Sequence, residues 1–403
     1  MEFYQMYNDL LYDFRCRQGR CALLIGGILW AALLVGCDSG TAPSIYDPNR
    51  SSLPDPVIED VIPEDRALAG VDEVIIVGQH FSSQTTDNLV YFGEDRARVV
   101  EASSTQLRMV APNSPQPELE LRLVVIGAEN FSNSVSYRLD PPFVEFGEVK
   151  DFEDVFGIAT DRVGNVYVAM AAFGIPVGII RVSPNGERSE YISSPFLWTD
   201  LDHGSGNDLY GVRSVRAVFR YQEGANNFEV FAVVPDNAVR LTSIAVDTND
   251  HIWAVGNNKS IYSISPDKTV KNYEFDADIQ DVALFDDFLY IAALQNKNSK
   301  IWRFKINSSD VLGTPEELID MTAFNGSTAF ALAFSVAGHL FVGTDATDPV
   351  VVVDPNGVGQ LLYPGVLKQP ARRFAWGVQE QLYAATNSTE MIAAGIIRIT
   401  TRD

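Results

Sequence analysis

The chain has 403 residues, of which 46% are apolar and 21% charged, so it can supply the cores of two or three domains. Its net charge of -23 would repel phosphate backbones, which excludes nucleic acid as an expected partner. All three cysteines lie within residues 1–37, so the remaining chain has neither a disulfide nor a cysteine-based metal site or nucleophile.

Residues 1–36 are predicted to be an export signal. Arg15, Arg17 and Arg20 precede an apolar run, ALLIGGILWAALLV, at residues 22–35. A helix of that length would span about 21 Å, less than the ~30 Å hydrocarbon core of a bilayer. A short apolar run after basic residues is typical of a signal peptide and is too short for a membrane-spanning helix.

The end of this run, Leu34-Val35-Gly36-Cys37, resembles the lipobox of bacterial lipoproteins. The resemblance implies cleavage before Cys37 and acylation of its thiol, and several acyl chains give stable membrane anchoring. We therefore expect a cell-envelope protein whose lipid anchor binds a membrane. Localisation at the outer membrane is favoured, and Asp38, directly after the cysteine, makes the inner membrane the alternative. A chance cysteine after an uncleaved helix is the alternative. Residues 37–52 are polar and are predicted to form a flexible, lipidated tether.

Residues 53–140 are predicted to form an all-β sandwich. Short apolar runs rich in β-branched residues alternate with turn clusters, for example at residues 74–77, 89–92 and 121–125. The segments IEDVIP (58–63), VGQHF (77–81) and VAP (110–112) resemble those of the IPT/TIG immunoglobulin-like fold. The resemblance implies a spacer or adhesive module.

Residues 142–403 contain an internal repeat. An apolar-aromatic-small motif recurs six times at intervals of 43, 43, 37, 51 and 42 residues, with its aromatic side chains at Tyr167, Tyr210, Trp253, Tyr290, Phe341 and Tyr383. Four short strands in about 43 residues are typical of a β-propeller blade, so six blades are predicted. The last unit ends after its third strand, and residues 143–149 are predicted to supply the fourth and close the ring. The repeated aromatic residues are expected to pack between blades.

The first unit, GIATD followed by GNVYVA, resembles NHL-type and gluconolactonase-type propellers. The enzymes related to gluconolactonase hold a divalent cation in the central channel with carboxylate and amide side chains. Here the inner strands GIATD, DLDHG, SIAVD, DVALF, ALAFS and RFAWG are mostly apolar or small. We therefore expect no metal ligands, no catalytic residues and no cofactor. A cation such as calcium in the channel is the alternative.

Ligand contacts are expected in the loops that join the second strand to the third and one blade to the next. The candidate ligand-binding residues are Phe173, Trp198, Arg213, Arg240, Asp345, Arg373 and Asn387. Arg372 lies in the same group of loops. Aromatic rings, amides and guanidinium groups suit a sugar or a peptide. Ordinary loop residues without a ligand would show the same composition.

The sequence therefore predicts an all-β protein with an Ig-like β-sandwich followed by a six-bladed β-propeller. The favoured function is non-catalytic binding of a glycan, a peptide or a partner protein at the cell envelope. A lactonase-like or lyase-like enzyme and a structural subunit of an envelope assembly are the alternatives.

Overall fold

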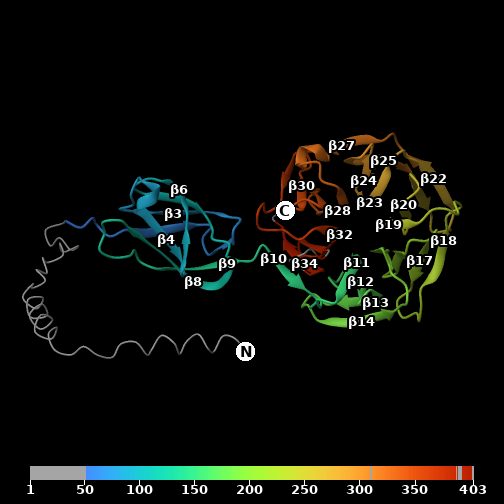
Figure 1. Cartoon of the computed structure of the whole chain (residues 1–403), viewed down its shortest axis with the longest axis horizontal. Helices are drawn as coiled ribbons and strands as arrows, with labels where there is room; N and C mark the ends of the chain where they lie inside the picture. Colours follow the sequence, from blue (N-terminus) through green and yellow to red (C-terminus); the bar gives the residue numbers. More distant parts are fainter. Residues whose placement is uncertain (1–50, 309–310, 387, 389–392, 402–403) are drawn as a thin grey trace, which may run out of the picture. The chain divides into compact units, whose positions relative to one another are not determined.

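A computed structural model describes residues 51–308, 311–386, 388 and 393–401 (Figure 1). The predicted signal segment, Cys37 and most of the predicted tether lie outside these residues, as does the candidate residue Asn387. Within the described ranges, no helix has both the length and the hydropathy needed to cross a bilayer.

The first domain is a sandwich of two sheets. One sheet has the order β1-β3-β7-β6 and the other β2-β9-β8-β4-β5. Their bounds are β1 Val57–Ile62, β2 Arg66–Leu68, β3 Glu73–Gln79, β4 Asn88–Phe92, β5 Asp95–Ala97, β6 Val99–Ala102, β7 Gln106–Val110, β8 Gln116–Val125 and β9 Val135–Asp140, with a short 3-10 helix, η1, at Thr85–Asp87.

The core of this sandwich follows from the alternation of apolar side chains along its strands. In β3, Val74 and Ile76 are fully buried while their neighbours point outward. The two sheets share one core, in which Val74 and Ile76 join Leu121 and Leu123 of β8. Period-two burial on both sheets gives an Ig-like sandwich.

The second domain consists of six four-stranded antiparallel blades in the part of the chain that the structure describes (Figure 1). Blades 1 to 3 contain β11 Glu153–Thr160, β12 Val166–Ala172, β13 Ile175–Val182, β14 Arg188–Ser193; β15 Asp200–His203, β16 Leu209–Val212, β17 Ala217–Tyr221, β18 Glu229–Val233; and β19 Leu241–Val246, β20 Ile252–Gly256, β21 Ser260–Ile264, β22 Val270–Glu274.

Blades 4 to 6 contain β23 Asp278–Phe285, β24 Phe288–Gln295, β25 Asn298–Ser308, β27 Glu316–Asp320; β28 Ala329–Phe334, β29 Leu340–Thr344, β30 Val350–Val353, β31 Gly359–Leu361; and β32 Ala371–Trp376, β33 Gln381–Thr386, β34 Gly395–Thr400 with β10 Phe143–Phe146. The short β26, Val311–Leu312, pairs antiparallel with the end of β25, and the 3-10 helix η2, Met321–Phe324, precedes blade 5. Together the two domains confirm the predicted all-β fold class.

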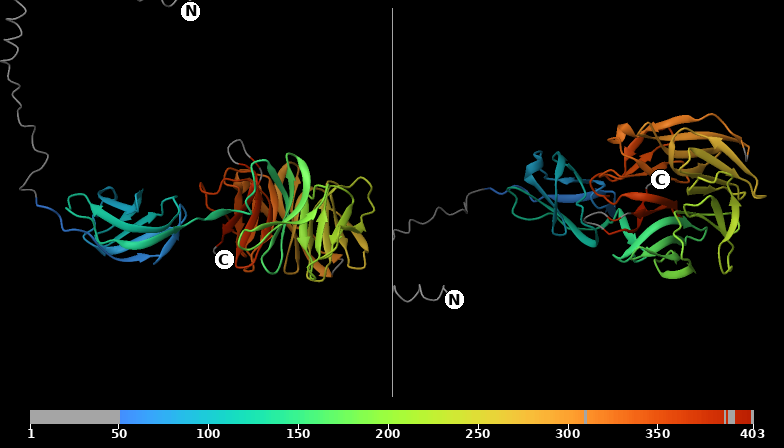
Figure 2. Two further views of the ribbon diagram at one scale, coloured as in Figure 1. Left: turned by 90° about the horizontal axis from the view of Figure 1, so that it is seen from below. Right: turned by 45° about the vertical axis from the view of Figure 1, so that its right-hand side comes forward.

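The strand β10 pairs antiparallel with β34, so the first and last strands of the propeller lie side by side in blade 6 (Figure 2). Phe143 is opposite Ile399, and Phe146 is opposite Ile396. The strand ends at Phe146 because Gly147 and Glu148 adopt positive φ angles of 73° and 47°. Such angles are incompatible with an extended strand.

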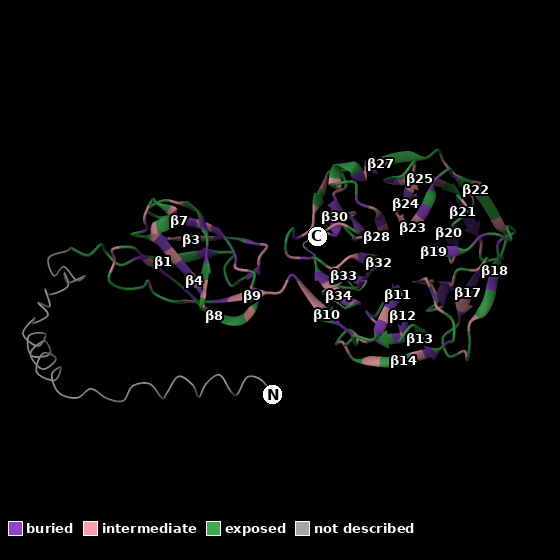
Figure 3. Ribbon diagram, viewed as in Figure 1, coloured by how far each residue is buried: buried purple, intermediate pink, exposed green. Residues whose placement is uncertain are grey.

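The middle strands of the blades are buried and the outermost ones are largely exposed, as β20 and β22 illustrate (Figure 3). Each repeated aromatic residue lies in the second strand of its blade and is at most 7% exposed. Two examples show the packing between blades. Tyr167 lies in a hydrophobic core with Leu201 of blade 2, and Trp253 lies in another core with Val282 of blade 4. The aromatic residues therefore pack between blades, as predicted.

Candidate functional site

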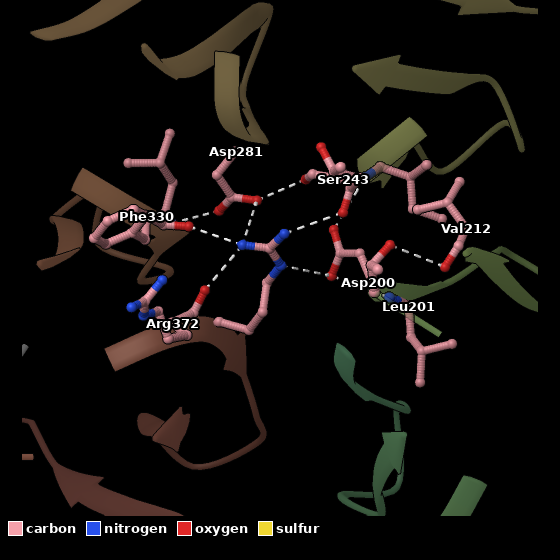
Figure 4. A network of polar contacts seen from close by, with 12 residues as sticks. Asp200, Leu201, Val212, Ser243, Asp281, Phe330 and Arg372 are labelled. Carbon is pink, nitrogen blue, oxygen red and sulfur yellow. Dashed lines mark hydrogen bonds and ion pairs between the residues drawn. The ribbon is translucent and has the colours of Figure 1, made fainter. Parts of the chain in front are cut away.

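The centre of the ring contains two buried aspartates and one arginine (Figure 4). Asp200 begins β15, Asp281 lies in β23 and Arg373 lies in β32, which are the inner strands of blades 2, 4 and 6. Asp200 is 6% exposed and Asp281 is 4% exposed. Because the inner strand of each blade lines the central channel, side chains from blades 2, 4 and 6 meet there.

The guanidinium of Arg373 is surrounded by oxygen atoms. Its Nε lies 3.5 Å from Asp200 Oδ1, and its Nη1 lies 4.0 Å from Asp281 Oδ1. Nη1 also donates to the carbonyl oxygens of Phe330 and Arg372, both at 2.9 Å, and Nη2 donates to that of Thr242 at 3.0 Å. Arg373 thereby links its own blade 6 to blades 2, 3, 4 and 5.

The carboxylate of Asp200 is also bound by backbone N–H groups. Ile244 N, in the inner strand of blade 3, donates to Asp200 Oδ2 at 3.0 Å, and Leu201 N donates to Oδ1 at 3.0 Å. These bonds fix the carboxylate against a neighbouring blade and replace the water that burial removes.

Asp281 is bound in the same manner. Leu332 N, in blade 5, donates to Asp281 Oδ2 at 2.7 Å, and the Ser243 hydroxyl donates to Oδ1 at 2.6 Å. Burial raises the pKa of Asp281 to about 7, although the positive charge of Arg373 acts in the opposite direction. Burial likewise raises the pKa of Asp200.

Asp202 is a third acidic residue in the channel, on the same strand as Asp200. Its carboxylate accepts from Val246 N at 2.7 Å and from His203 N at 2.8 Å. No lysine or arginine among the described residues forms an ion pair with it. Burial raises its pKa to about 7, and the nearby charges of Asp200 and Asp281 add to the effect.

A cavity of about 620 Å³, here called the mouth cavity, lies at the end of the channel where the inner strands begin. Arg372 lies at its edge, exposed, with its guanidinium 4.3 Å from the centre of the Phe330 ring. The polar and aromatic lining residues are Phe156, Thr199, Thr242, Asn257, Asp278, Gln280, Phe330, Arg372 and Arg373.

A second cavity of about 410 Å³, the inner cavity, continues the channel toward the opposite end. It is lined by Asp200, Asp202 and Asp281, among other residues, and Arg373 lines both cavities. Arg373 therefore stands between the mouth cavity and the buried carboxylates.

Among the predicted ligand-binding residues, Arg373 lies in this site and Trp198 does not. Trp198 is 2% exposed, belongs to the core between blades 1 and 2, and donates from Nε1 to Ser194 Oγ at 3.2 Å. Its burial contradicts the predicted ligand contact.

The other described candidates do not line the mouth cavity. Phe173 is 78% exposed and stacks on Phe152 at 4.6 Å. Arg213 lies 3.6 Å above the Phe196 ring. Arg240 donates to main-chain carbonyls, including that of Val239 at 2.9 Å, and Asp345 accepts from Thr328 N at 2.8 Å. Arg213 and Asp345 therefore contact a neighbouring loop, and the Arg240 side chain contacts its own.

Although the inner strands are mostly apolar or small, Asp200, Asp202 and Asp281 converge in the channel. The signal was present in DLDHG and DVALF, where aspartate stands within an inner strand. Nevertheless, the described residues contain no group of three or more histidine, cysteine or acidic side chains arranged to hold a metal ion. The cation found among the carboxylates is the Arg373 guanidinium.

Comparisons with known proteins agree with this architecture. Residues 56–139 match the IPT/TIG domain family. An auxiliary nutrient binding protein from Bacteroides ovatus is 13% identical, with a TM-score of 0.51 over 89% of this chain and 100% of its own. A similar protein from Bacteroides thetaiotaomicron is 11% identical, with a TM-score of 0.51 over 88% of this chain and 98% of its own.

A luciferin-regenerating enzyme is 13% identical, with a TM-score of 0.53 over 64% of this chain and 95% of its own. No protein of curated function matches the chain at a significant level. At these identities the similarity concerns the fold alone. The chain carries an IPT/TIG domain at residues 56–139, followed by a six-bladed β-propeller.

Proposed function

We propose that this chain is a lipid-anchored protein of the bacterial cell envelope that binds a glycan, without chemical conversion, in the mouth cavity of its propeller. The observation that carries the proposal is the composition of that cavity. It combines an exposed guanidinium above an aromatic ring with two amide side chains, Asn257 and Gln280, in about 620 Å³.

These groups match the chemistry of sugars. Hydroxyl groups accept hydrogen bonds from guanidinium and amide N–H groups, and the C–H faces of sugar rings pack on aromatic side chains. Phe156 and Phe330 are half-buried in the cavity wall, which leaves part of each ring available for contact. A volume in the range of small-molecule pockets suits one or two sugar units.

The position of the two buried aspartates favours binding over catalysis at these residues. Asp200 and Asp281 line the inner cavity, and Arg373 stands between them and the mouth cavity. Their oxygens already accept hydrogen bonds from Leu201, Ile244, Leu332 and Ser243. A glycan in the mouth cavity would therefore meet no free carboxylate from this pair, and a general acid or base must reach the reacting atom directly or through one water.

Solved structures that are similar over most of this chain support a binding role. Two of them are described as auxiliary nutrient binding proteins, and each covers nearly nine tenths of this chain. The signal-like residues 1–36 and the lipobox ending at Cys37 support placement at the envelope.

The test is glycan binding by the purified chain and two variants, Arg372→Ala and Gln280→Ala. Loss of a charge-assisted hydrogen bond costs about 1.5–3 kcal/mol, so Arg372→Ala should weaken binding roughly 10- to 100-fold. A glycan array identifies the ligand, and calorimetry measures the dissociation constant.

Arg162→Ala is the matched control. Arg162 is also exposed, but it follows β11 at the opposite end of the channel and lines a different cavity. The control should bind like the unmodified chain. Equal affinity of Arg372→Ala and the unmodified chain would contradict the proposed site, and a chemically altered glycan after incubation would contradict the non-catalytic role.

A further inference from the structure

The environment of the Arg373 guanidinium has the composition of a calcium site. Two carboxylates and three main-chain carbonyls approach it, from Asp200, Asp281, Thr242, Phe330 and Arg372. Every one of these contacts is an oxygen atom. Calcium takes six to eight oxygen ligands of these two kinds, at distances of 2.3–2.6 Å in a flexible geometry.

A buried pair of carboxylates needs a counter-cation. Asp200 and Asp281 are almost fully buried, and removing one partner of a buried charge pair leaves an uncompensated charge that is strongly destabilising. In this chain the counter-cation is covalently attached, because Arg373 extends into the channel from β32. An arginine side chain stays protonated under all ordinary conditions.

A divalent cation does not fit beside this guanidinium. The two positive groups would compete for the same carboxylate oxygens, and like charges about 4 Å apart repel strongly in a low-dielectric channel. The residues of the channel therefore disagree with the alternative that a calcium ion is bound there.

We propose that Arg373 takes the place of a channel cation, because its guanidinium occupies a position whose oxygen atoms could otherwise bind calcium. The same guanidinium links five of the six blades. The unmodified chain consequently holds no divalent cation at its centre. Removal of the guanidinium exposes the oxygen ligands and converts the same position into a cation site. This inference concerns the channel and does not depend on the glycan proposed for the mouth cavity.

The test compares the purified full chain with Arg373→Ala in EDTA and in calcium chloride. We expect the melting temperature of the unmodified chain to be the same in both solutions. In EDTA, Arg373→Ala should melt lower by at least about 5 °C, because a buried pair is broken. Millimolar calcium should restore most of that loss, and calorimetry should show one calcium bound per chain.

Four further variants separate a cation site from a general loss of packing. Arg373→Lys keeps a positive charge at this position, so calcium should not stabilise it. Arg373→Ala combined with Asp281→Asn lacks one carboxylate, so calcium rescue should be lost. Arg162→Ala leaves the cluster intact and should melt like the unmodified chain in both solutions. Arg373→Gln provides the same comparison should the alanine variant fail to fold.

Two results would overturn the inference. One is a stoichiometric divalent cation in the unmodified chain whose removal by EDTA lowers its melting temperature. The other is indifference of both Arg373→Ala and Arg373→Gln to calcium. Neither result bears on glycan binding, which is measured separately with Arg372→Ala.

Discussion

At the scale of single residues, Asp202 shows how the channel controls ionisation. Its carboxylate has two backbone N–H donors but no ion pair among the described residues, and burial raises its pKa to about 7. Asp200 and Asp281 differ from it because the Arg373 guanidinium lies between them. The three aspartates therefore share one channel but have different electrostatic surroundings.

The raised pKa of Asp202 predicts a pH-dependent stability. The folded chain holds a proton on Asp202 up to about pH 7, whereas the unfolded chain releases it near pH 3.8. Since the folded state binds more protons in that window, the free energy of unfolding falls as pH rises from about 4 to about 7. One such carboxyl contributes a slope of at most about 1.4 kcal/mol per pH unit.

Asp202→Asn should remove its share of that slope, so the variant gains stability relative to the unmodified chain at pH 8 and not at pH 4. Denaturant unfolding at the two pH values measures the difference. Thr248→Ala, at an exposed position without a titratable side chain, is the control and should change stability equally at both pH values. If the stability of Asp202→Asn changed with pH in the same way as that of the unmodified chain, the Asp202 carboxyl would not be the source of the pH dependence.

The sequence predicted Arg373 as a candidate site residue but not the residues around it. Asp200, Asp281 and Arg373 lie in three different repeats, and nothing in the local pattern of any one repeat shows that they meet. Trp198 was predicted as a ligand contact because it falls in a connection between blades, yet apolar burial places it in a core. Residue type and loop position alone do not distinguish these two outcomes.

At the scale of elements, β10 is the strand that closes the ring. Phe146 is its buried residue, 5% exposed, and its ring lies 5.0 Å from that of Tyr383 in β33. It also shares a core with Val182 of blade 1. One side chain on β10 therefore joins blade 6 to blade 1.

Phe146→Ala should destabilise the propeller by about 3–5 kcal/mol, since it removes a large buried aromatic ring and leaves a cavity. Denaturant unfolding measures the loss. Phe143→Ala, on the same strand at a half-buried position, should cost clearly less. Equal losses would show that β10 contributes through backbone pairing alone.

The existence of β10 followed from counting strands, because the last repeat has three and a closed ring requires four. The length of β10 did not follow from this count, since the predicted segment 143–149 continues three residues beyond the observed end at Phe146. The positive φ angles of Gly147 and Glu148 end the strand. Glycine at residue 147 was a visible signal, whereas Glu148 gave none.

At the scale of the whole molecule, repeat spacing predicted the propeller and alternating burial predicted the sandwich, because both patterns extend over many residues. The channel cluster could not be predicted in the same way. It depends on closure of the ring, which brings residues of blades 2, 4 and 6 to a common centre.

Membrane attachment is a property of the whole chain that one substitution tests. Cys37→Ser should abolish incorporation of labelled fatty acid and move the protein from the membrane fraction to the soluble fraction, because the hydroxyl cannot replace the thiol in the expected acylation. Fractionation and mass spectrometry of the N-terminal peptide measure the change. Ser39→Ala, which leaves the lipobox unchanged, is the control. Unchanged membrane retention of Cys37→Ser would contradict a lipid anchor at this residue.

The pairing of β10 with β34 also has a mechanical consequence. The polypeptide enters the propeller through β10, so any tension between an N-terminal anchor and a ligand held by the propeller passes through the strand that closes the ring. Four residue pairs, from Phe143–Ile399 to Phe146–Ile396, would bear that load first. The ring would therefore yield at its closing seam before the other blades, and the contacts of Phe146 would set the force at which it does so.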